Sequence, residues 1–376
     1  MKSETLALQY TKGTYEEIRS VDIPLHLSTT FLRNDDGSFT NDYRYSRLDN
    51  PNRRLLEKCF TALEKGKVAF AFSSGMAAIQ AVIQSLNTGD HVVLPDDVFF
   101  NVKMLVKDIF KQWGLTYTYV DMTNSDKVVQ SIRPNTTLIW IETPSNPQLK
   151  ITDIKEIVQI AKSNDILVAV DNTWFTPILQ NPIEIGADIV MHSTTKYFGG
   201  HSDVMGGCLV LKEKNELSNK IRQIQLLSGA VPSPFDCWLI MRGIKTLPLR
   251  IRTQSSTAKK LAEYLTEHPK IEKVYYPGLQ NYPQYNIVKN QIKKGFGAML
   301  SVLIKGNKNT TIKISNELKL FTTATSLGGV ESLIEHRASV EGNHSTTPNN
   351  LLRVSIGLEH IDDLIRDWEK ALKTIA

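Results

Sequence analysis

The sequence lacks most of the features that mark specialised classes of proteins. Its 376 residues include only three cysteines, Cys59, Cys208 and Cys237, and these are far apart. So few, scattered cysteines fit a reducing compartment and exclude both a disulfide framework and a CxxC metal site. The N-terminus has no apolar signal segment, and no apolar run approaches the length of a membrane span. We therefore expect a cytoplasmic protein that has no membrane partner.

Charge of one sign is not concentrated either. The chain has 44 lysines and arginines against 39 aspartates and glutamates, a net charge of +5, and the signs alternate along the sequence. This pattern does not indicate a nucleic-acid partner. Neither GxGxxG nor GxxxxGK[ST] occurs, which disfavours a nucleotide-binding protein. His192 and His201 have no HxxxH spacing or carboxylate cluster beside them, so we expect no metal site.

Short apolar runs alternate with amphipathic stretches from about residue 50. The pattern predicts helices over 75–87, 101–113, 152–163 and 214–228. It predicts strands at 68–72, 91–95, 116–120, 137–142, 166–171, 188–192 and 207–211. Such alternation is typical of an α/β fold, here with a seven-stranded, mostly parallel sheet.

The alternation becomes less regular after about residue 235. A long helix through about residue 268 precedes expected strands at 274–278, 298–304 and 351–357, and a terminal helix starts at Ile361. At roughly 150 residues per domain, the length suggests two or three domains. We predict an N-terminal arm with little periodicity at 1–45, a large α/β domain at 46–235 and a small α+β domain at 236–376.

Two chemically informative residues stand where predicted strands end. Gly75, in SSGMAAIQ (73–80), opens a helix whose N-terminus could bind an anion, although glycine is also common in plain turns. Asp171 ends a buried apolar strand, where an uncompensated carboxylate is costly. It either caps a helix or pairs with a cationic ring nitrogen of a cofactor.

Two further residues follow neighbouring strands. Lys196 comes after the hydroxyl residues Ser193, Thr194 and Thr195, so it is either a solvated lysine or a desolvated nucleophile beside a phosphate. Asn146, in IETPSNP (141–147), either donates to a ligand oxygen or belongs to an ordinary turn. An anion seat, a strand-end carboxylate and a loop lysine are the groups that a pyridoxal phosphate enzyme needs.

Eight segments in this order resemble the Cys/Met-metabolism family of fold-type I pyridoxal phosphate enzymes. This family includes the cystathionine γ-synthases and the cystathionine β- and γ-lyases, and the resemblance runs from about residue 20 to the end. The segments are YRYSRLDNP (43–51), SSGMAAI (73–79), IETPSNP (141–147), VDNTWFTP (170–177), HSTTKYFGGHSDV (192–204), RGIKTL (242–247), SLGGVESLI (326–334) and LLRVSIGLE (351–359).

The resemblance implies a role for each matching residue. Lys196 would bond covalently to the cofactor and move protons, and Asp171 would pair with the ring nitrogen. The other implied cofactor contacts are Gly75, Met76, Ser193 and Thr195 at the phosphate, Thr173 beside the ring, and Tyr45 and Arg47 reaching from a neighbouring subunit. The implied substrate contacts are Asn146, Ser326 and Arg353, with Arg353 clamping the α-carboxylate.

Three departures from the family pattern fall at the site. Phe99 stands where the family usually has a tyrosine that stacks on the cofactor, so stacking is retained but the phenol is lost. Thr325 occupies a position linked to substrate choice. A shorter segment, EHRASVEGNHSTTPNN (335–350), replaces the usual loop.

The resemblance implies a trans-sulfuration enzyme that uses pyridoxal 5'-phosphate and a small sulfur amino acid. We expect a cystathionine C–S lyase working by β- or γ-elimination, with γ-replacement on an acylated homoserine, the cystathionine γ-synthase reaction, as the alternative. An alternative of another class is a non-catalytic, pyridoxal phosphate-binding regulatory protein. The family also implies a homo-oligomer whose active unit is a dimer, commonly paired into a tetramer.

Overall fold

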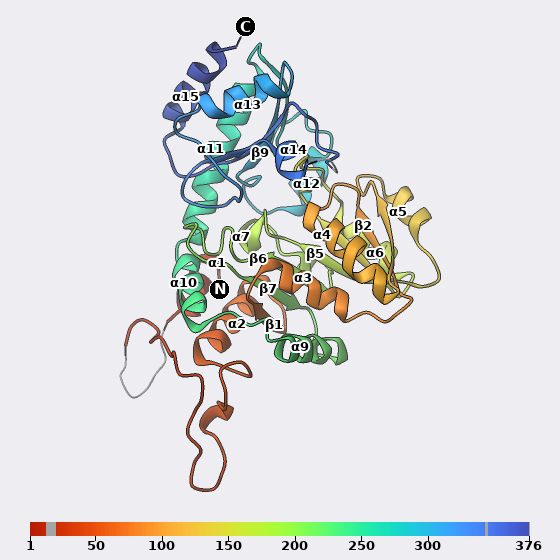
Figure 1. The fold of residues 1–376 in the computed structure, drawn as a ribbon, viewed down its shortest axis with the longest axis vertical. Helices are drawn as coiled ribbons and strands as arrows, with labels where there is room; N and C mark the ends of the chain where they lie inside the picture. Colours follow the sequence, from red (N-terminus) through yellow and green to blue (C-terminus); the bar gives the residue numbers. More distant parts are fainter. Residues whose placement is uncertain (13–19, 343–344, 376) are drawn as a thin grey trace.

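A seven-stranded sheet forms the larger half of the computed structural model, which describes residues 1–12, 20–342 and 345–375 (Figure 1). The strands are β1 (Val68–Phe72), β2 (His91–Pro95), β3 (Thr116–Val120), β4 (Thr136–Glu142), β5 (Leu167–Asp171), β6 (Ile189–Ser193) and β7 (Gly207–Leu211). Their order is β1-β7-β6-β5-β4-β2-β3. β7 runs antiparallel to both of its neighbours, β1 and β6, and the four other strand pairs are parallel. The predicted seven-stranded, mostly parallel sheet is confirmed, and each strand begins within one residue of its predicted start.

Helices cover both faces of this sheet. They are α2 (Pro51–Glu64), α3 (Gly75–Gln84), α4 (Phe100–Met104), α5 (Ser125–Ser131), α6 (Ile154–Lys162), α7 (Thr176–Leu179), α8 (Pro182–Ile185) and α9 (Glu216–Ser228). Alternate strand residues pack with α3 and α9 on one face and with α2 and α6 on the other. Buried strands of a parallel sheet need cover on both faces, which explains their nearly continuous apolar sequences.

The helix expected at 101–113 is broken into three short pieces. After α4 the chain forms a π-helical turn, η2 (Leu105–Ile109), and then a 3-10 turn, η3 (Phe110–Trp113). The apolar spacing that predicts a single helix is still used, because Val102, Val106 and Phe110 are all buried. The segment therefore packs as expected, although its backbone is not one regular helix.

A second sheet contains β8 (Ile271–Tyr275), β9 (Met299–Ile304), β10 (Thr322–Thr323), β11 (Leu333–Glu335) and β12 (Leu351–Ser355). Its order is β10-β11-β12-β9-β8. α10 (Pro234–Ile244) packs mainly on α2 of the large-sheet half. The helices that follow it are α11 (Leu247–Thr266), α12 (Tyr285–Gln291), α13 (Lys308–Glu317), α14 (Arg337–Glu341) and α15 (Ile361–Lys373). The sequence predicts β9 and β12 to within two residues, but it places β8 three residues too late, at 274–278. It does not predict β10 and β11, whose two and three residues are too short to show alternation.

The N-terminal segment differs partly from the expected extended arm. Residues Ser3–Gln9 form helix α1, which contacts α2 and α11 and buries Ala7 completely. Further along, a 3-10 turn, η1 (Thr40–Asp42), interrupts an irregular stretch that extends away from the two sheets (Figure 1). Residues 13–19 of the predicted arm lie outside the described residues.

Candidate active site

The carboxyl ends of β1, β4, β5 and β6 meet at one edge of the large sheet. Parallel strands place their ends at the same edge, which is where open α/β folds bind ligands. Gly75 follows β1, Asn146 follows β4, Asp171 ends β5, and Lys196 follows β6. The structure therefore brings these residues together, as their positions after strands predict.

Lys196 joins this edge to the second sheet. Its Nζ donates to Ser326 Oγ at 2.8 Å. Burial, reinforced by the positive charge of Arg353, lowers the pKa of Lys196 to about 8. A larger fraction of this amine is neutral near neutral pH than for an exposed lysine, so it can act as a nucleophile and a base.

Ser326 connects Lys196 to Arg353. Its carbonyl oxygen accepts a hydrogen bond from Arg353 Nη2 at 3.2 Å, while its hydroxyl faces Lys196. The backbone φ of Ser326 is +120°, a region that residues with a side chain rarely adopt. The strained backbone is held in place by both of these contacts.

Arg353 lies on β12, and its side chain is 4% exposed. Nη1 donates to Asn146 Oδ1 at 3.2 Å, and Nη2 pairs with Glu335 Oε2 at 2.8 Å. Burial lowers the pKa of Arg353 to about 10, and Glu335 acts in the opposite direction. The guanidinium is thus charged, oriented and close to Lys196 through Ser326, as a carboxylate clamp requires.

Asp171 is tied to the end of β6 through Thr173. Asp171 Oδ1 accepts the backbone N–H of Thr173 at 2.9 Å, and Thr173 Oγ1 accepts the N–H of Ser193 at 2.9 Å. Burial raises the pKa of Asp171, although the contacts with Thr173 lower it in part. In the described part of the chain no lysine or arginine forms an ion pair with Asp171. A cationic ring nitrogen would stabilise this buried carboxylate.

The start of α3 forms a cradle beside Ser193. A Cβ atom at Gly75 would lie 2.9 Å from Ser193 Cβ, so only glycine leaves this space open. Ser74 caps α3 by accepting from Ala77 N at 3.1 Å. The N–H groups of Gly75 and Met76 then point out of the first turn, where they suit a phosphate. The Thr195 hydroxyl, in contrast, is already bonded to the backbone of Gly206.

Phe99 leads to a carboxylate that the sequence reasoning overlooked. Its backbone N–H donates to Glu142 Oε2 at 2.8 Å. Glu142 ends β4 directly opposite Asp171 on β5. Burial, followed by the charge of Asp171, raises the pKa of Glu142 well above its ordinary value. The signal was present, because Glu142 also ends a buried apolar strand.

Tyr45 and Arg47 do not join the site in the part of the chain that the structure describes. Tyr45 is 46% exposed, and Arg47 Nη1 donates to the carbonyl of Leu226 on α9 at 2.6 Å. Neither side chain forms a hydrogen bond or ion pair with the residues around Lys196 in the described ranges. Their predicted role in a neighbouring subunit stays a prediction.

Segment 335–350 connects β11 to β12, with residues 343–344 outside the described residues. Thr325 donates to Glu335 Oε1, so its hydroxyl is engaged within the protein. The His336 ring contacts Ser339 Oγ at 2.7 Å and the carbonyl of Asn349 at 2.8 Å. Both His336 contacts lie within the segment itself.

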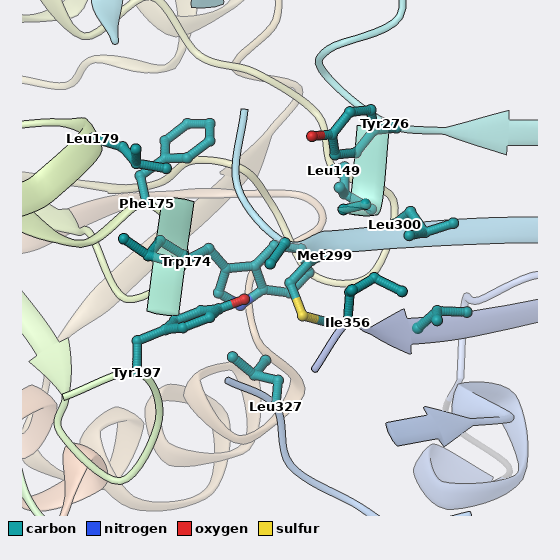
Figure 2. Packing of buried hydrophobic residues seen from close by; sticks show 14 of the residues in the cluster. Leu149, Trp174, Phe175, Leu179, Tyr197, Tyr276, Met299, Leu300, Leu327 and Ile356 are labelled. Carbon is teal, nitrogen blue, oxygen red and sulfur yellow. The ribbon is translucent and has the colours of Figure 1, made fainter. Parts of the chain in front are cut away.

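An apolar cluster behind the site fixes these polar residues (Figure 2). Trp174 and Phe175 follow Thr173, Tyr197 follows Lys196, and Leu327 follows Ser326. All four pack in the same buried cluster as Met299 of β9. Thr173, Lys196 and Ser326 are therefore each next to a residue of one close-packed core. This core fixes the positions of the three side chains relative to one another.

We also searched the described residues for a membrane-spanning helix and for a metal site. No helix in residues 1–12, 20–342 and 345–375 is long and apolar enough to cross a membrane. Over the same ranges, no three histidine, cysteine, aspartate or glutamate side chains come together in a way that could hold a metal ion.

Fold and site together define a pyridoxal phosphate enzyme of the fold-type I class, since the phosphate cradle, Asp171 and Lys196 fit the three polar parts of that cofactor. The model of the Cys/Met metabolism PLP-dependent enzyme family matches residues 4–373, and the chain belongs to this family. It is thus a trans-sulfuration enzyme that uses pyridoxal phosphate. This membership gives no support to the non-catalytic alternative.

Relatives of different activity are equally similar to the chain. It is 44% identical to the cystathionine gamma-synthase of Mycobacterium tuberculosis strain H37Rv, covering 94% of this chain and 92% of that one. It is 43% identical to the cystathionine gamma-lyase of Bacillus subtilis, covering 100% of both chains. The crystal structure of metB from Corynebacterium glutamicum superposes with a TM-score of 0.97 at 39% identity, covering 100% of this chain and 99% of that chain.

Proposed function

We propose that the protein is a cystathionine C–S lyase that works by β- or γ-elimination. The observation that carries this proposal is Lys196, a base with a pKa of about 8 that bonds to Ser326 and is linked through Ser326 to Arg353. An elimination needs one such base to take and return protons beside a fixed amino acid. The full-length similarity to the Bacillus subtilis gamma-lyase supports the same reaction.

Arg353 would bind the α-carboxylate of the substrate. Asn146 Oδ1, the Ser326 carbonyl and Glu335 hold its guanidinium, so little side-chain freedom is lost on binding. Asn146 lies on the large-sheet side and Arg353 on β12, so the substrate would lie where the two sheets meet. A bidentate pair at this point would orient the α-carbon toward Lys196.

Lys196 would move the protons. When bound, pyridoxal phosphate supplies an electron sink for the charge left on the substrate carbon. The neutral Nζ of Lys196 would take the α-proton and later return it. The hydrogen bond to Ser326 Oγ would keep the amine in position between these two steps. Because Phe99 has no phenol, Lys196 is the base that this arrangement offers, and Asp171 would keep the ring nitrogen protonated.

The second candidate function is γ-replacement, in which cysteine displaces the acyl group of an acylated homoserine. The 44% identity with gamma-synthases and the TM-score of 0.97 with metB favour it. The two reactions would use the same proposed residues, so only the products separate them.

Product analysis of the purified holoenzyme tests both candidates. With cystathionine, β-elimination releases homocysteine, pyruvate and ammonia, whereas γ-elimination releases cysteine, 2-oxobutanoate and ammonia. With an acylhomoserine and cysteine, replacement forms cystathionine and the free acid. We expect release of the oxo acid from cystathionine to be the faster reaction. Faster formation of cystathionine would support the second candidate, and turnover in neither assay would contradict both.

We also propose that the active unit is a dimer in which Tyr45 and Arg47 of one subunit complete the phosphate site of the other, and that two dimers pair into a tetramer. Both side chains are exposed, and the same arm exposes Val21, Leu27 and Leu32. Exposed apolar residues on an extended segment favour a partner surface.

Arg47→Ala should weaken retention of the cofactor during dialysis about tenfold, through the loss of a charge-assisted phosphate contact. Arg44→Ala, at an exposed arginine three residues away, is the matched control. Sedimentation of a fully active monomer would contradict the proposed dimer.

A further inference from the structure

A chain of four charged side chains extends from the proposed carboxylate clamp into segment 335–350. Glu335 Oε2 contacts Arg353 Nη2 at 2.8 Å and Arg337 Nη1 at 3.0 Å. On its other side, Arg337 Nη2 contacts Glu341 Oε1 at 3.1 Å. Glu341 Oε2 accepts hydrogen bonds from Ser345 Oγ at 2.7 Å and Thr347 Oγ1 at 2.8 Å.

All four side chains are buried. Their exposed fractions are 4% for Arg353, 6% for Glu335, 5% for Arg337 and 6% for Glu341. Charges withdrawn from water in this way need a partner, because the loss of hydration costs more than a loose contact returns. Each of the four charges is therefore stabilised by its neighbour, and removal of the Arg337 charge leaves the Glu335 carboxylate paired with Arg353 alone.

Glu335 on its own would hinder the clamp. Its carboxylate contacts the guanidinium that is proposed to bind the α-carboxylate, so the two carboxylates compete for one cation. Thr325 fixes one oxygen of Glu335, and the other oxygen is shared between Arg353 and Arg337. Because Arg337 takes part of that negative charge, Arg353 keeps a positive potential toward the site.

We propose that Arg337 is a positioning residue for substrate binding, which holds Glu335 and draws its charge away from Arg353. The inference rests on the proposed function, since it takes Arg353 as the carboxylate clamp. It assigns segment 335–350 a task in binding amino acids. It also makes Thr325 act on the substrate through Glu335 and not by direct contact.

The test compares the holoenzyme of wild type, Arg337→Met and the double variant Arg337→Met with Glu335→Gln. L-Alanine is the probe, because it carries the α-amino and α-carboxylate groups but no leaving group, and its binding is followed by the visible absorbance of the cofactor. Arg337→Met should raise the Kd for L-alanine and the KM for cystathionine by about tenfold or more, with kcat within about threefold. The double variant should recover most of this loss, because the competing charge is gone.

Two further variants control for a purely structural effect. Glu341→Gln removes the charge of this side chain, while its amide oxygen can accept from Arg337 and its amide nitrogen can donate to the Ser345 and Thr347 hydroxyls. Arg337 is then drawn more strongly to Glu335, and the Kd for L-alanine should not rise. Arg366→Met removes an exposed arginine on α15 and should change the Kd by less than about twofold. If Arg337→Met does not fold, the Glu341→Gln result still tests the charge argument.

Several results would overturn the proposal. These are wild-type affinity in Arg337→Met, a double variant that binds L-alanine no better than Arg337→Met, or a Kd raised more than threefold by Glu341→Gln. Loss of the cofactor absorbance in Arg337→Met before any amino acid is added would also do so, because it places the defect in the cofactor site. If L-alanine binding depends on Arg337 but cystathionine is not cleaved, the lyase proposal fails while this inference stands.

Discussion

The two halves of the active site are built by different physical means. On the large-sheet side, backbone N–H groups and hydroxyls hold the polar residues, as in the contacts from Thr173 to Asp171 and from Ser193 to Thr173. On the second-sheet side, buried ion pairs hold them, as between Arg353, Glu335 and Arg337. In the proposed function the first half would hold the cofactor, and the second would present a charge balance that the carboxylate of the substrate shifts.

This difference suggests where substitutions act. A change on the large-sheet side should affect the chemistry or the cofactor, because its residues face the proposed phosphate and ring. A change on the second-sheet side should affect KM, because its residues determine the charge presented to the amino acid. Lys196 belongs to both halves through its bond to Ser326.

The largest expected effect is that of Lys196→Ala. Removing the proposed proton-transferring base should lower turnover of cystathionine by at least about a thousandfold. The variant should keep its thermal unfolding midpoint within a few degrees. Lys214→Ala, at an exposed lysine, is the control and should behave as wild type. Turnover within tenfold of wild type would remove Lys196 from the mechanism.

Arg353→Lys should give the next largest effect and should separate the two halves. Lysine keeps the charge but cannot form the planar bidentate pair, and it leaves Glu335 less well matched. A loss of about 2 to 3 kcal/mol in binding corresponds to a KM raised roughly 30- to 150-fold. Cofactor absorbance should be unchanged. A variant that loses cofactor instead would show that the two halves are not separable.

The lowered pKa of Lys196 predicts how cofactor binding depends on pH. Burial lowers this pKa from 10.5 to about 8, so the amine loses its proton as the pH rises through 8. The rate at which cofactor-free protein takes up pyridoxal phosphate should therefore rise about tenfold per pH unit below 8 and level off above it. Stopped-flow absorbance measures this rate. A rate that still rises in this way above pH 9 would contradict the lowered pKa.

The smallest expected effect is that of Glu142→Gln on stability. Burial and Asp171 favour the neutral acid of Glu142, and glutamine has the same shape and can still accept from Phe99 N. The free energy of unfolding near pH 5 should change by less than about 1 kcal/mol.

The raised pKa of Glu142 also predicts how the stability of the wild type changes with pH. A pKa raised in the folded state means that the wild type loses stability as the pH rises from 4.5 toward the folded pKa, because the unfolded state releases the Glu142 proton in this range while the folded state still holds it. The variant should lose less stability over that range in denaturant titrations. An identical pH dependence in the two proteins would show that Glu142 has an ordinary pKa.

Local sequence predicts the large-sheet side well. Asp171 is the last residue of β5, and Gly75 lies three residues after the end of β1. The same short stretch of sequence therefore predicts both the strand and the functional residue. The same reasoning could have found Glu142 at the end of β4. It could not predict α1, where a single buried residue, Ala7, gives no periodic signal.

The second-sheet side is less accessible to such reasoning. Asn146 and Arg353 are 207 residues apart in the chain, yet they share a hydrogen bond. Arg337 has no sequence signal, because a single arginine in a polar stretch is usually solvated. Its burial follows from the pairing of β11 with β12, which sets Glu335 opposite Arg353.

The sequence by itself determined the seven-stranded sheet, the family and the order of the strand-end residues, because apolar periodicity and contiguous motifs are local properties. Only the tertiary structure decided that Thr325 bonds to Glu335, that Arg337 shares that carboxylate with Arg353, and that Arg47 bonds to the carbonyl of Leu226 on α9. The physical reason is that buried charges are paired by the packing of elements far apart in the chain, and no short segment contains that information.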